Sequence, residues 1–202
     1  MFGMGTAQPT KGGPAVPPGG GSLARMVTSG GRVDLALLQR IAEAVPCEEF
    51  VRFMQKPVLA GSAIHRGTLA QRTGAREMNR TILFEPEQAG GPGSVSESLK
   101  HAVYPLLKSP HATTAPHVFA LGRIDSNDFV MPDYAISRQH AVIELRRDGY
   151  LLKDCGSTNG TFLKGVRLEK KSAPLADKDV VSFARYEFAF LLPGSLYAML
   201  RG

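Results

Sequence analysis

The sequence between residues 117 and 163 reads HVFALGRIDSNDFVMPDYAISRQHAVIELRRDGYLLKDCGSTNGTFL. Short apolar runs alternate in it with clusters of Gly, Asn, Asp and Ser, at a spacing of about ten residues that is typical of strands joined by turns. The same pattern begins near residue 99 and continues to the end of YEFAFLL. We therefore expect a mainly β fold, a sandwich or barrel, in the second half of the chain.

Three polar clusters in this stretch each follow a strand-like run. They are Gly122-Arg123, Ser137-Arg138-Gln139-His140 and Gly156-Ser157-Thr158-Asn159-Gly160. Together they supply guanidinium forks, a hydroxyl and an amide on a tight turn, which are the groups that an anion and an extended peptide need. We interpret the three clusters as one phosphate-reading surface made of loops.

Each cluster alone also has a plain structural interpretation. Arg123 would be an ordinary surface arginine at a strand end, and residues 156–160 would be a hairpin turn, because Asn-Gly tolerates positive φ. His140 could act as a base toward Ser137, but the sequence offers no third member and no oxyanion hole. We expect His140 to be a buried organiser of its loop. The presence of all three clusters favours the binding interpretation.

The clusters resemble, in order and spacing, the signature of the forkhead-associated (FHA) domain. The matching residues are Gly122-Arg123, Ser137-Arg138-x-His140 and Asp154-x-Gly156-Ser157-Thr158-Asn159-Gly160-Thr161, and the resemblance covers about residues 99–193. It implies an FHA-type β-sandwich that binds phosphothreonine peptides with loops at one end and is not catalytic. Its implied partner is a threonine-phosphorylated protein, either a Ser/Thr kinase or a kinase substrate.

The resemblance also implies a role for each matching residue. Arg123 and Ser137 would hold the phosphate, and Arg138 would add charge. Thr158 and Asn159 would contact the phosphopeptide, Asn159 at the peptide backbone. A further set would shape the loops: Gly122, His140, Gly156 and Gly160. Asn127-Asp128 also resembles the family's pattern after the Gly-Arg pair.

Three turns depart from the family's usual residues. The chain has Asp177-Lys178-Asp179 where Gly-Asp is common, Lys164-Gly165 where Asn-Gly is common, and Ala184-Arg185 near a usual glycine. All three are turns of the scaffold, so these departures concern turn geometry more than the phosphate contacts.

The first half of the chain has a different composition. Residues 1–31 are rich in Gly and Pro, and we expect them to form a disordered tail. Residues 32–95 are expected to form a small, partly helical region of unknown role plus a linker, and residues 89–98 have the composition of that linker. Residues 96–193 would be the FHA phosphopeptide-binding domain, and residues 194–202 a short C-terminal segment.

Two helices are predicted in the region 32–95. The first spans Val33 to Val45, with Asp34 as N-cap and an apolar face that includes Leu38. Pro46 ends it and begins the second, whose apolar face contains Phe50, Val51 and Met54.

Composition limits the other classes of protein to which the chain could belong. The chain has 202 residues and a formal net charge of +6, but residues 117–193 carry only +1 of it. Two distant cysteines suggest neither a disulfide framework nor a zinc site. We expect no metal, no cofactor and no membrane span, and the cytoplasm as the compartment. The sequence contains no nucleotide-binding loop, nucleophile elbow or metal-ligand cluster, so we do not expect an enzyme.

Two other binding functions stay open. One is an FHA-fold scaffold or assembly subunit that binds without phosphate. The other is a nucleic-acid-binding protein that uses an arginine-rich region between residues 66 and 80, although a solvated basic surface is the expected reading of that region. Its arginines are Arg66, Arg72, Arg76 and Arg80.

Overall fold

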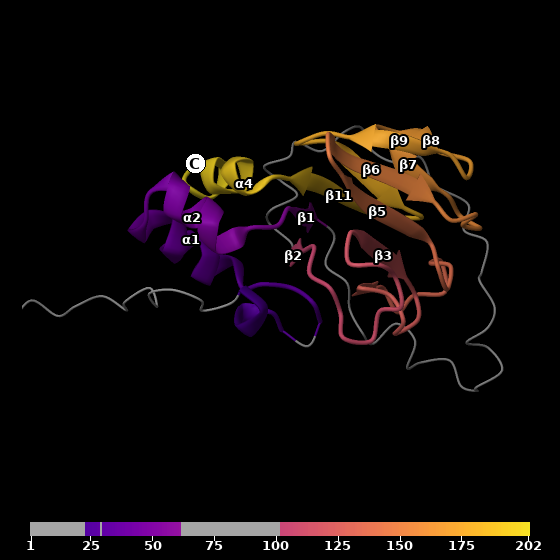
Figure 1. Ribbon diagram of the computed structural model, residues 1–202, viewed down its shortest axis with the longest axis horizontal. Helices are drawn as coiled ribbons and strands as arrows, with labels where there is room; N and C mark the ends of the chain where they lie inside the picture. Colours follow the sequence, from indigo (N-terminus) through magenta and orange to yellow (C-terminus); the bar gives the residue numbers. More distant parts are fainter. Residues whose placement is uncertain (1–22, 29, 62–101) are drawn as a thin grey trace, which may run out of the picture.

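Two β-sheets pack face to face, and three helices cover the outer side of one of them (Figure 1). The computed structural model describes residues 23–28, 30–61 and 102–202. The arginines of the region 66–80 and the linker at 89–98 lie outside the described residues. Within them, the predicted mainly β sandwich is confirmed.

The first sheet has six strands and the second has five. The six-stranded sheet has the order β2-β1-β11-β10-β7-β8, and the five-stranded sheet the order β4-β3-β5-β6-β9. The strands are β1 Val58–Gly61, β2 Ala102–Pro105, β3 Val118–Gly122, β4 Phe129–Val130, β5 Ala141–Arg146, β6 Gly149–Asp154, β7 Thr161–Leu163, β8 Val166–Arg167, β9 Ser172–Leu175, β10 Val180–Phe183 and β11 Tyr186–Leu191.

Within the described part of the chain, all strand pairs are antiparallel except that of β3 with β4, in which Leu121 pairs with Phe129. Because β3 and β4 run in the same direction, both strands end at the same end of the sheet. The arrangement places the loops that follow β3, β4 and β6 at one end of the sandwich.

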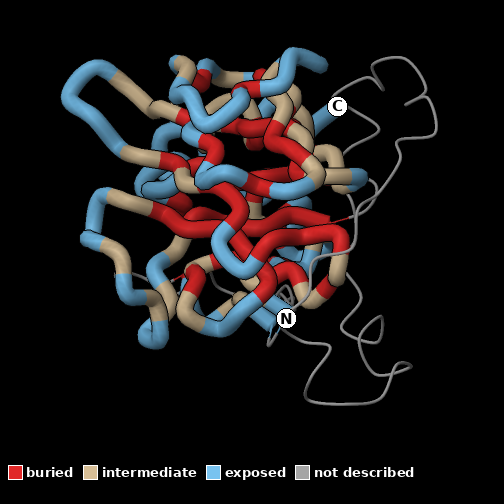
Figure 2. Tube along the Cα trace, turned by 90° about the vertical axis from the view of Figure 1, so that its right-hand side faces the viewer, coloured by how far each residue is buried: buried red, intermediate tan, exposed pale blue. Residues whose placement is uncertain are grey.

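The part of the six-stranded sheet formed by β2, β1 and β11 is buried on both faces, and buried strands, in red, lie at the centre of Figure 2. Along β1, Leu59 points into the core between the sheets, whereas Val58 and Ala60 pack against the helices. Along β11, Phe188 and Phe190 likewise belong to the inner core, and Ala189 and Leu191 to the helical side. Because both faces are covered, these strands are continuously apolar instead of alternating.

The helical layer consists of α1 Leu35–Ala44, α2 Cys47–Met54 and α4 Pro193–Leu200. Asp34 caps α1, where its side chain accepts a hydrogen bond from the backbone N–H of Leu37 at 3.2 Å. The predicted first helix and its cap are therefore confirmed. In α2, Phe50 and Met54 are buried as predicted, but Val51 is 37% exposed. Burying a side chain the size of Phe50 contributes about 1.5–3 kcal/mol.

The region 32–95 contributes β1, which lies between β2 and β11 and pairs with both. Its helices pack with α4 into a second hydrophobic core. Part of the expected tail is also ordered. Leu23–Met26 forms a 3₁₀ helix, η1, and Leu23 is buried in this second core because Val27 and Val33 bridge the chain back toward β2.

The three turns that depart from the family's usual residues all contain left-handed backbone. Lys164 has φ 52°, Lys178 has φ 68° and Ala184 has φ 54°. The turns therefore adopt a conformation that favours glycine, at a cost of about 1–2 kcal/mol for each residue with a Cβ.

None of the described helices is long and apolar enough to cross a membrane. Both cysteines, Cys47 and Cys155, are described, and each is a free thiol at the surface.

Candidate functional site

Backbone hydrogen bonds bring the three predicted clusters together at one end of the sandwich. The N–H of Arg123 donates to the carbonyl of Ser137 at 3.0 Å, and the N–H of His140 donates to the carbonyl of Leu121 at 2.9 Å. The N–H of Cys155 then donates to the carbonyl of His140 at 3.0 Å. The β3–β4, β4–β5 and β6–β7 loops are thus joined at their bases.

The guanidinium of Arg123 lies inside this end of the sandwich. The residue is only 5% exposed, and its Cζ atom lies 5.2 Å from the centre of the Tyr134 ring. Burial lowers the pKa of Arg123, and the charge of Arg138 lowers it further, while Tyr134 and Asp133 raise it. An arginine stays charged in proteins under these influences, so the site holds a cation with little water around it.

The hydroxyl of Ser137 connects two loops. Its Oγ accepts a hydrogen bond from the backbone N–H of Thr158 at 3.1 Å. A serine hydroxyl has one proton to donate besides its acceptor lone pairs. This arrangement therefore keeps the O–H of Ser137 available as a donor to an anion.

The β6–β7 loop is also connected through Asn159. Its Nδ2 donates to the carbonyl of Ala135 at 2.8 Å. Thr158 and Arg138 are exposed at the same end of the sandwich. The structure thus brings all five predicted phosphopeptide-binding residues to neighbouring loops: Arg123, Ser137, Arg138, Thr158 and Asn159.

His140 is fully buried, with 0% exposure. Its Nδ1 accepts from the backbone N–H of Ser137 at 3.1 Å, so Nε2 carries the proton and donates to the carbonyl of Gly160 at 3.0 Å. Burial lowers its pKa, which keeps the ring neutral. Both ring nitrogens are hydrogen-bonded to the backbone of the β4–β5 and β6–β7 loops.

Gly122 lies where a side chain has no room. A Cβ at this position would come within 2.3 Å of the carbonyl oxygen of Arg138 and 2.7 Å of the Asn127 side-chain nitrogen. That nitrogen donates to the carbonyls of Ile124 and Arg138, both at 2.8 Å. Glycine is required because the two loops close tightly over it.

Asp154, the first residue of the Asp-x-Gly-Ser-Thr-Asn-Gly-Thr motif, holds the β6–β7 loop in place. Its carboxylate accepts from the N–H of Gly156 at 3.0 Å, from the hydroxyl of Ser157 at 2.5 Å and from that of Thr161 at 2.8 Å. Burial alone would raise the pKa of Asp154, but these hydrogen bonds outweigh it and hold the pKa below its ordinary value. The signal for this role was an Asp two residues before a Gly-Ser turn.

A second cluster that the sequence did not reveal joins the β10–β11 turn to the β4–β5 loop. Asp133 forms an ion pair with Arg185 and accepts a hydrogen bond from the hydroxyl of Tyr186 at 2.5 Å. Burial and the bond to Asp133 raise the pKa of Tyr186 to about 12. Arg185, at one of the departing turns, thus fixes the loop that carries Ser137.

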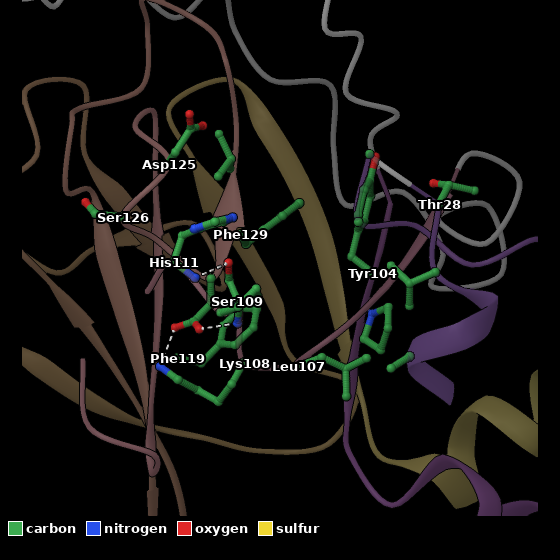
Figure 3. Close-up of a pocket in the computed structure, with 18 of the residues that line it drawn as sticks. Thr28, Tyr104, Leu107, Lys108, Ser109, His111, Phe119, Asp125, Ser126 and Phe129 are labelled. Atoms are coloured by element: carbon green, nitrogen blue, oxygen red, sulfur yellow. Dashed lines mark hydrogen bonds and ion pairs between the residues drawn. The ribbon is translucent and has the colours of Figure 1, made fainter. Parts of the chain in front are cut away.

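A separate cavity of about 880 Å³ lies between the 24–31 segment and the β2–β3 connection, as Figure 3 shows. Its lining includes Tyr104, Lys108 and Phe129, and none of the five predicted binding residues. The Nζ of Lys108 pairs with the carboxylate of Asp128 at 2.8 Å beside it. This cavity adjoins the β3–β4 loop but is not the predicted site.

A family model described as the FHA domain matches residues 119–184. Among curated proteins, the chain is 32% identical over 119 residues to an ABC transporter ATP-binding/permease protein of Mycobacterium tuberculosis, covering 57% of this chain and 14% of the transporter. It is 31% identical over 117 residues to the glycogen accumulation regulator GarA of M. tuberculosis, covering 54% of this chain and 71% of GarA. The chain therefore spans only a small part of the transporter's length.

One solved structure in the comparison is that of M. tuberculosis EmbR in complex with a low-affinity phosphopeptide. It is 28% identical, covers 45% of this chain and 21% of EmbR, and has a TM-score of 0.38.

Proposed function

The chain belongs to the FHA domain family, and from this premise we propose that it is a phosphothreonine-peptide-binding adaptor in Ser/Thr kinase signalling. The observation that carries the proposal is the junction of Arg123, Ser137 and Thr158. The backbone of the buried residue Arg123 is hydrogen-bonded to that of Ser137, and the Ser137 hydroxyl accepts from the Thr158 N–H, so the loops that carry these three residues are joined. The proposed partner is a threonine-phosphorylated protein, either a Ser/Thr kinase or a kinase substrate.

The proposed phosphate contacts come from two loops. A phosphothreonine brings nearly two negative charges and three acceptor oxygens. Arg123 would donate its guanidinium fork and Ser137 its O–H, and Arg138 would add charge from the rim. Charge-assisted hydrogen bonds contribute about 1.5–3 kcal/mol each. Micromolar binding needs about −8 kcal/mol, so three or four bonds near the upper end of this range would have to supply most of it against the cost of association.

Thr158 and Asn159 would hold the peptide on either side of the phosphate. The amide of Asn159 both donates and accepts, so it can bind the main chain of any sequence. Its bond to the carbonyl of Ala135 supports this role, because it fixes the direction of the side chain before a peptide arrives.

The proposed activity is binding and not catalysis. In the described residues the site has no nucleophile with a matched base, because both nitrogens of His140 are bonded to backbone groups. The free thiols of Cys47 and Cys155 agree with the cytoplasm as the proposed compartment, since a reducing environment keeps thiols unpaired.

Isothermal titration of the full chain with a phosphothreonine peptide library tests the proposal. Each sequence is titrated in its phosphothreonine, phosphoserine and unphosphorylated forms. We expect micromolar binding of selected phosphothreonine peptides and no measurable binding of the unphosphorylated forms. Equal binding of phosphorylated and unphosphorylated partners would instead indicate a phosphorylation-independent scaffold. Affinity capture from native lysate, with and without phosphatase treatment, would then identify the partner.

A further inference from the structure

Two basic side chains lie along the β6–β7 loop, each over one of its glycines. A Cβ on Gly160, where φ is 89°, would come within 2.9 Å of Nε of Arg167. A Cβ on Gly156, where φ is 78°, would come within 3.2 Å of Cε of Lys170. The glycines therefore leave the space in which these two stems pack against the loop.

Arg167 contacts a residue of the proposed peptide site directly. Its Nη2 donates to the carbonyl of Thr158 at 3.3 Å, and the side chain is exposed. A guanidinium has five N–H donors, and this bond uses one of them. The remaining donors belong to an exposed side chain beside the loop that would hold the peptide.

Lys170 is fixed by its own backbone. Its N–H donates to the carboxylate of Asp154 at 3.2 Å, and its φ of 66° is left-handed. The residue is exposed, so its ammonium group lies at the rim while the stem covers Gly156. This is the arrangement expected of a lysine that packs its methylenes and keeps its charge in water.

The carboxylates near this rim do not neutralise the two cations. Within the described part of the chain, the ion pairs include neither Arg167 nor Lys170. Asp154 is bonded to its own loop, and Asp133 to Arg185 and Tyr186. In the segment 167–171, three cations face the single acid Glu169.

We propose that Arg167 and Lys170 select phosphopeptides with a second anionic group near the phosphothreonine. The inference rests on the proposed function, because it concerns the same bound peptide. The path from Ser137 Oγ to Arg167 Nη2 consists of the hydrogen bond from the Thr158 N–H, the backbone of Thr158 itself, and the hydrogen bond to the Thr158 carbonyl. This is at most roughly 10 Å, the length of about three residues of extended chain. Since the phosphothreonine and an acidic side chain each add their own reach to this length, the second anion, a carboxylate or another phosphate, is placed two to four residues from the phosphothreonine.

The test uses the full chain and four synthetic peptides on one scaffold. The first carries phosphothreonine with neutral flanks. The second has Asp or Glu placed at each position from two to four residues before or after the phosphothreonine. The third has a second phosphothreonine in place of the acid, and the fourth is the acidic peptide without phosphate. Affinity is measured by isothermal titration at low and at high salt.

Four variants separate the contributions of Arg167 and Lys170 to the preference for a second anionic group. Lys170→Ala removes a cation without touching the hydrogen bond to Thr158, and Lys170→Glu reverses the charge. Arg167→Ala removes both the charge and that bond. Arg147→Ala is the matched control, because it removes an exposed arginine from the β5–β6 turn at the opposite end of the sandwich.

We expect the wild-type chain to bind the acidic peptide about fivefold more tightly than the neutral one at low salt, which is the contribution of one or two exposed ion pairs. Lys170→Ala and Arg167→Ala should reduce this preference, Lys170→Glu should abolish it, and Arg147→Ala should leave it unchanged. The preference should also shrink at high salt. Comparison of the doubly phosphorylated peptide with the acidic peptide shows whether a second phosphate can take the place of the carboxylate.

Equal affinity of the wild-type chain for acidic and neutral phosphopeptides would overturn the inference and leave the proposed function standing. A preference that Lys170→Glu and Arg167→Ala both leave intact would also overturn it, since other groups would then supply the selectivity. Binding of the unphosphorylated acidic peptide as tightly as its phosphorylated form would contradict the proposed function itself.

Discussion

The side-chain oxygen of Ser137 accepts the backbone N–H of Thr158 at 3.1 Å, across 21 positions of sequence. This bond joins the loop that carries the hydroxyl to the loop proposed to hold the peptide. It also orients the Ser137 hydroxyl, because one lone pair is committed to Thr158 and the proton remains for another acceptor. One hydrogen bond therefore positions both the hydroxyl proposed to donate to the phosphate and the loop proposed to bind the peptide.

Ser137→Ala removes both functions of this hydroxyl. We expect phosphopeptide affinity to fall about tenfold, the effect of one charge-assisted hydrogen bond. Stability should fall by about 1 kcal/mol, because the N–H of Thr158 loses its partner. Ser137→Thr keeps the hydroxyl and should retain more of the affinity. Titration with one phosphothreonine peptide and urea unfolding measure the two effects, and unchanged affinity in Ser137→Ala would remove this hydroxyl from the site.

Arg123→Ala removes the buried cation. We expect at least a tenfold loss of phosphopeptide affinity, because a charge-assisted contact contributes about 1.5–3 kcal/mol. The fold should survive, since the two hydrophobic cores lie elsewhere. Circular dichroism checks the fold and titration checks the affinity. Arg147→Ala serves as the control, and an equal loss in both variants would show that net charge, and not this position, governs binding.

Asn159→Ala removes an amide and no charge. We expect a loss of phosphopeptide affinity similar to that of Arg123→Ala, because the amide would hold the peptide backbone and also ties its loop to the carbonyl of Ala135. The two variants should differ in salt dependence. Affinity should still fall with added salt in Asn159→Ala, whereas Arg123→Ala should flatten that dependence. Titration at several salt concentrations distinguishes them; identical salt curves would contradict the assigned roles.

Gly122→Ala places a methyl group against the carbonyl of Arg138 and the amide of Asn127. We expect the free energy of unfolding to fall by about 1–3 kcal/mol, as for other overpacked sites. Gly194→Ala is the control, because a Cβ there meets nothing within 4 Å and the residue lies in the first turn of α4. That variant should be neutral or slightly stabilised. Urea unfolding compares them, and equal midpoints would show that the loops can open around a methyl group at no cost.

His140 should make folding stability depend on pH below neutrality. Burial lowers its folded pKa, while the unfolded ring titrates near pH 6.5. Stability is therefore complete above about pH 6.5 and is lost as pH falls toward the folded pKa, by at most about 1.4 kcal/mol per pH unit. The neighbouring carboxylate of Asp154 titrates below its ordinary range and acts only at lower pH.

Urea unfolding between pH 5 and pH 8 measures this slope. His140→Gln should flatten it at a lower overall stability, because glutamine does not titrate. His111→Gln, at an exposed histidine, should retain it. A slope that persists in His140→Gln would assign the pH dependence to another group.

Local features of the fold could be predicted from the sequence. The cap at Asp34 and the alternation that marks the strands depend on residues a few positions apart, so their physical causes are visible in a short window. The position of β1 between β2 and β11 could not be predicted in this way. A short apolar run has no property that names its partners, because strand pairing is decided by which faces the whole chain buries.

The sequence by itself determined the site's components: an arginine after a glycine, a Ser-Arg-x-His cluster and a Gly-Ser-Thr-Asn-Gly turn. Only the tertiary structure decided their surroundings. It linked Arg185 to Asp133 over 52 positions and laid Arg167 and Lys170 over the two glycines of the turn. Turn chemistry is local and is written in neighbouring residues, whereas contacts between distant charged side chains exist only once packing has brought their strands to the same end of the sandwich.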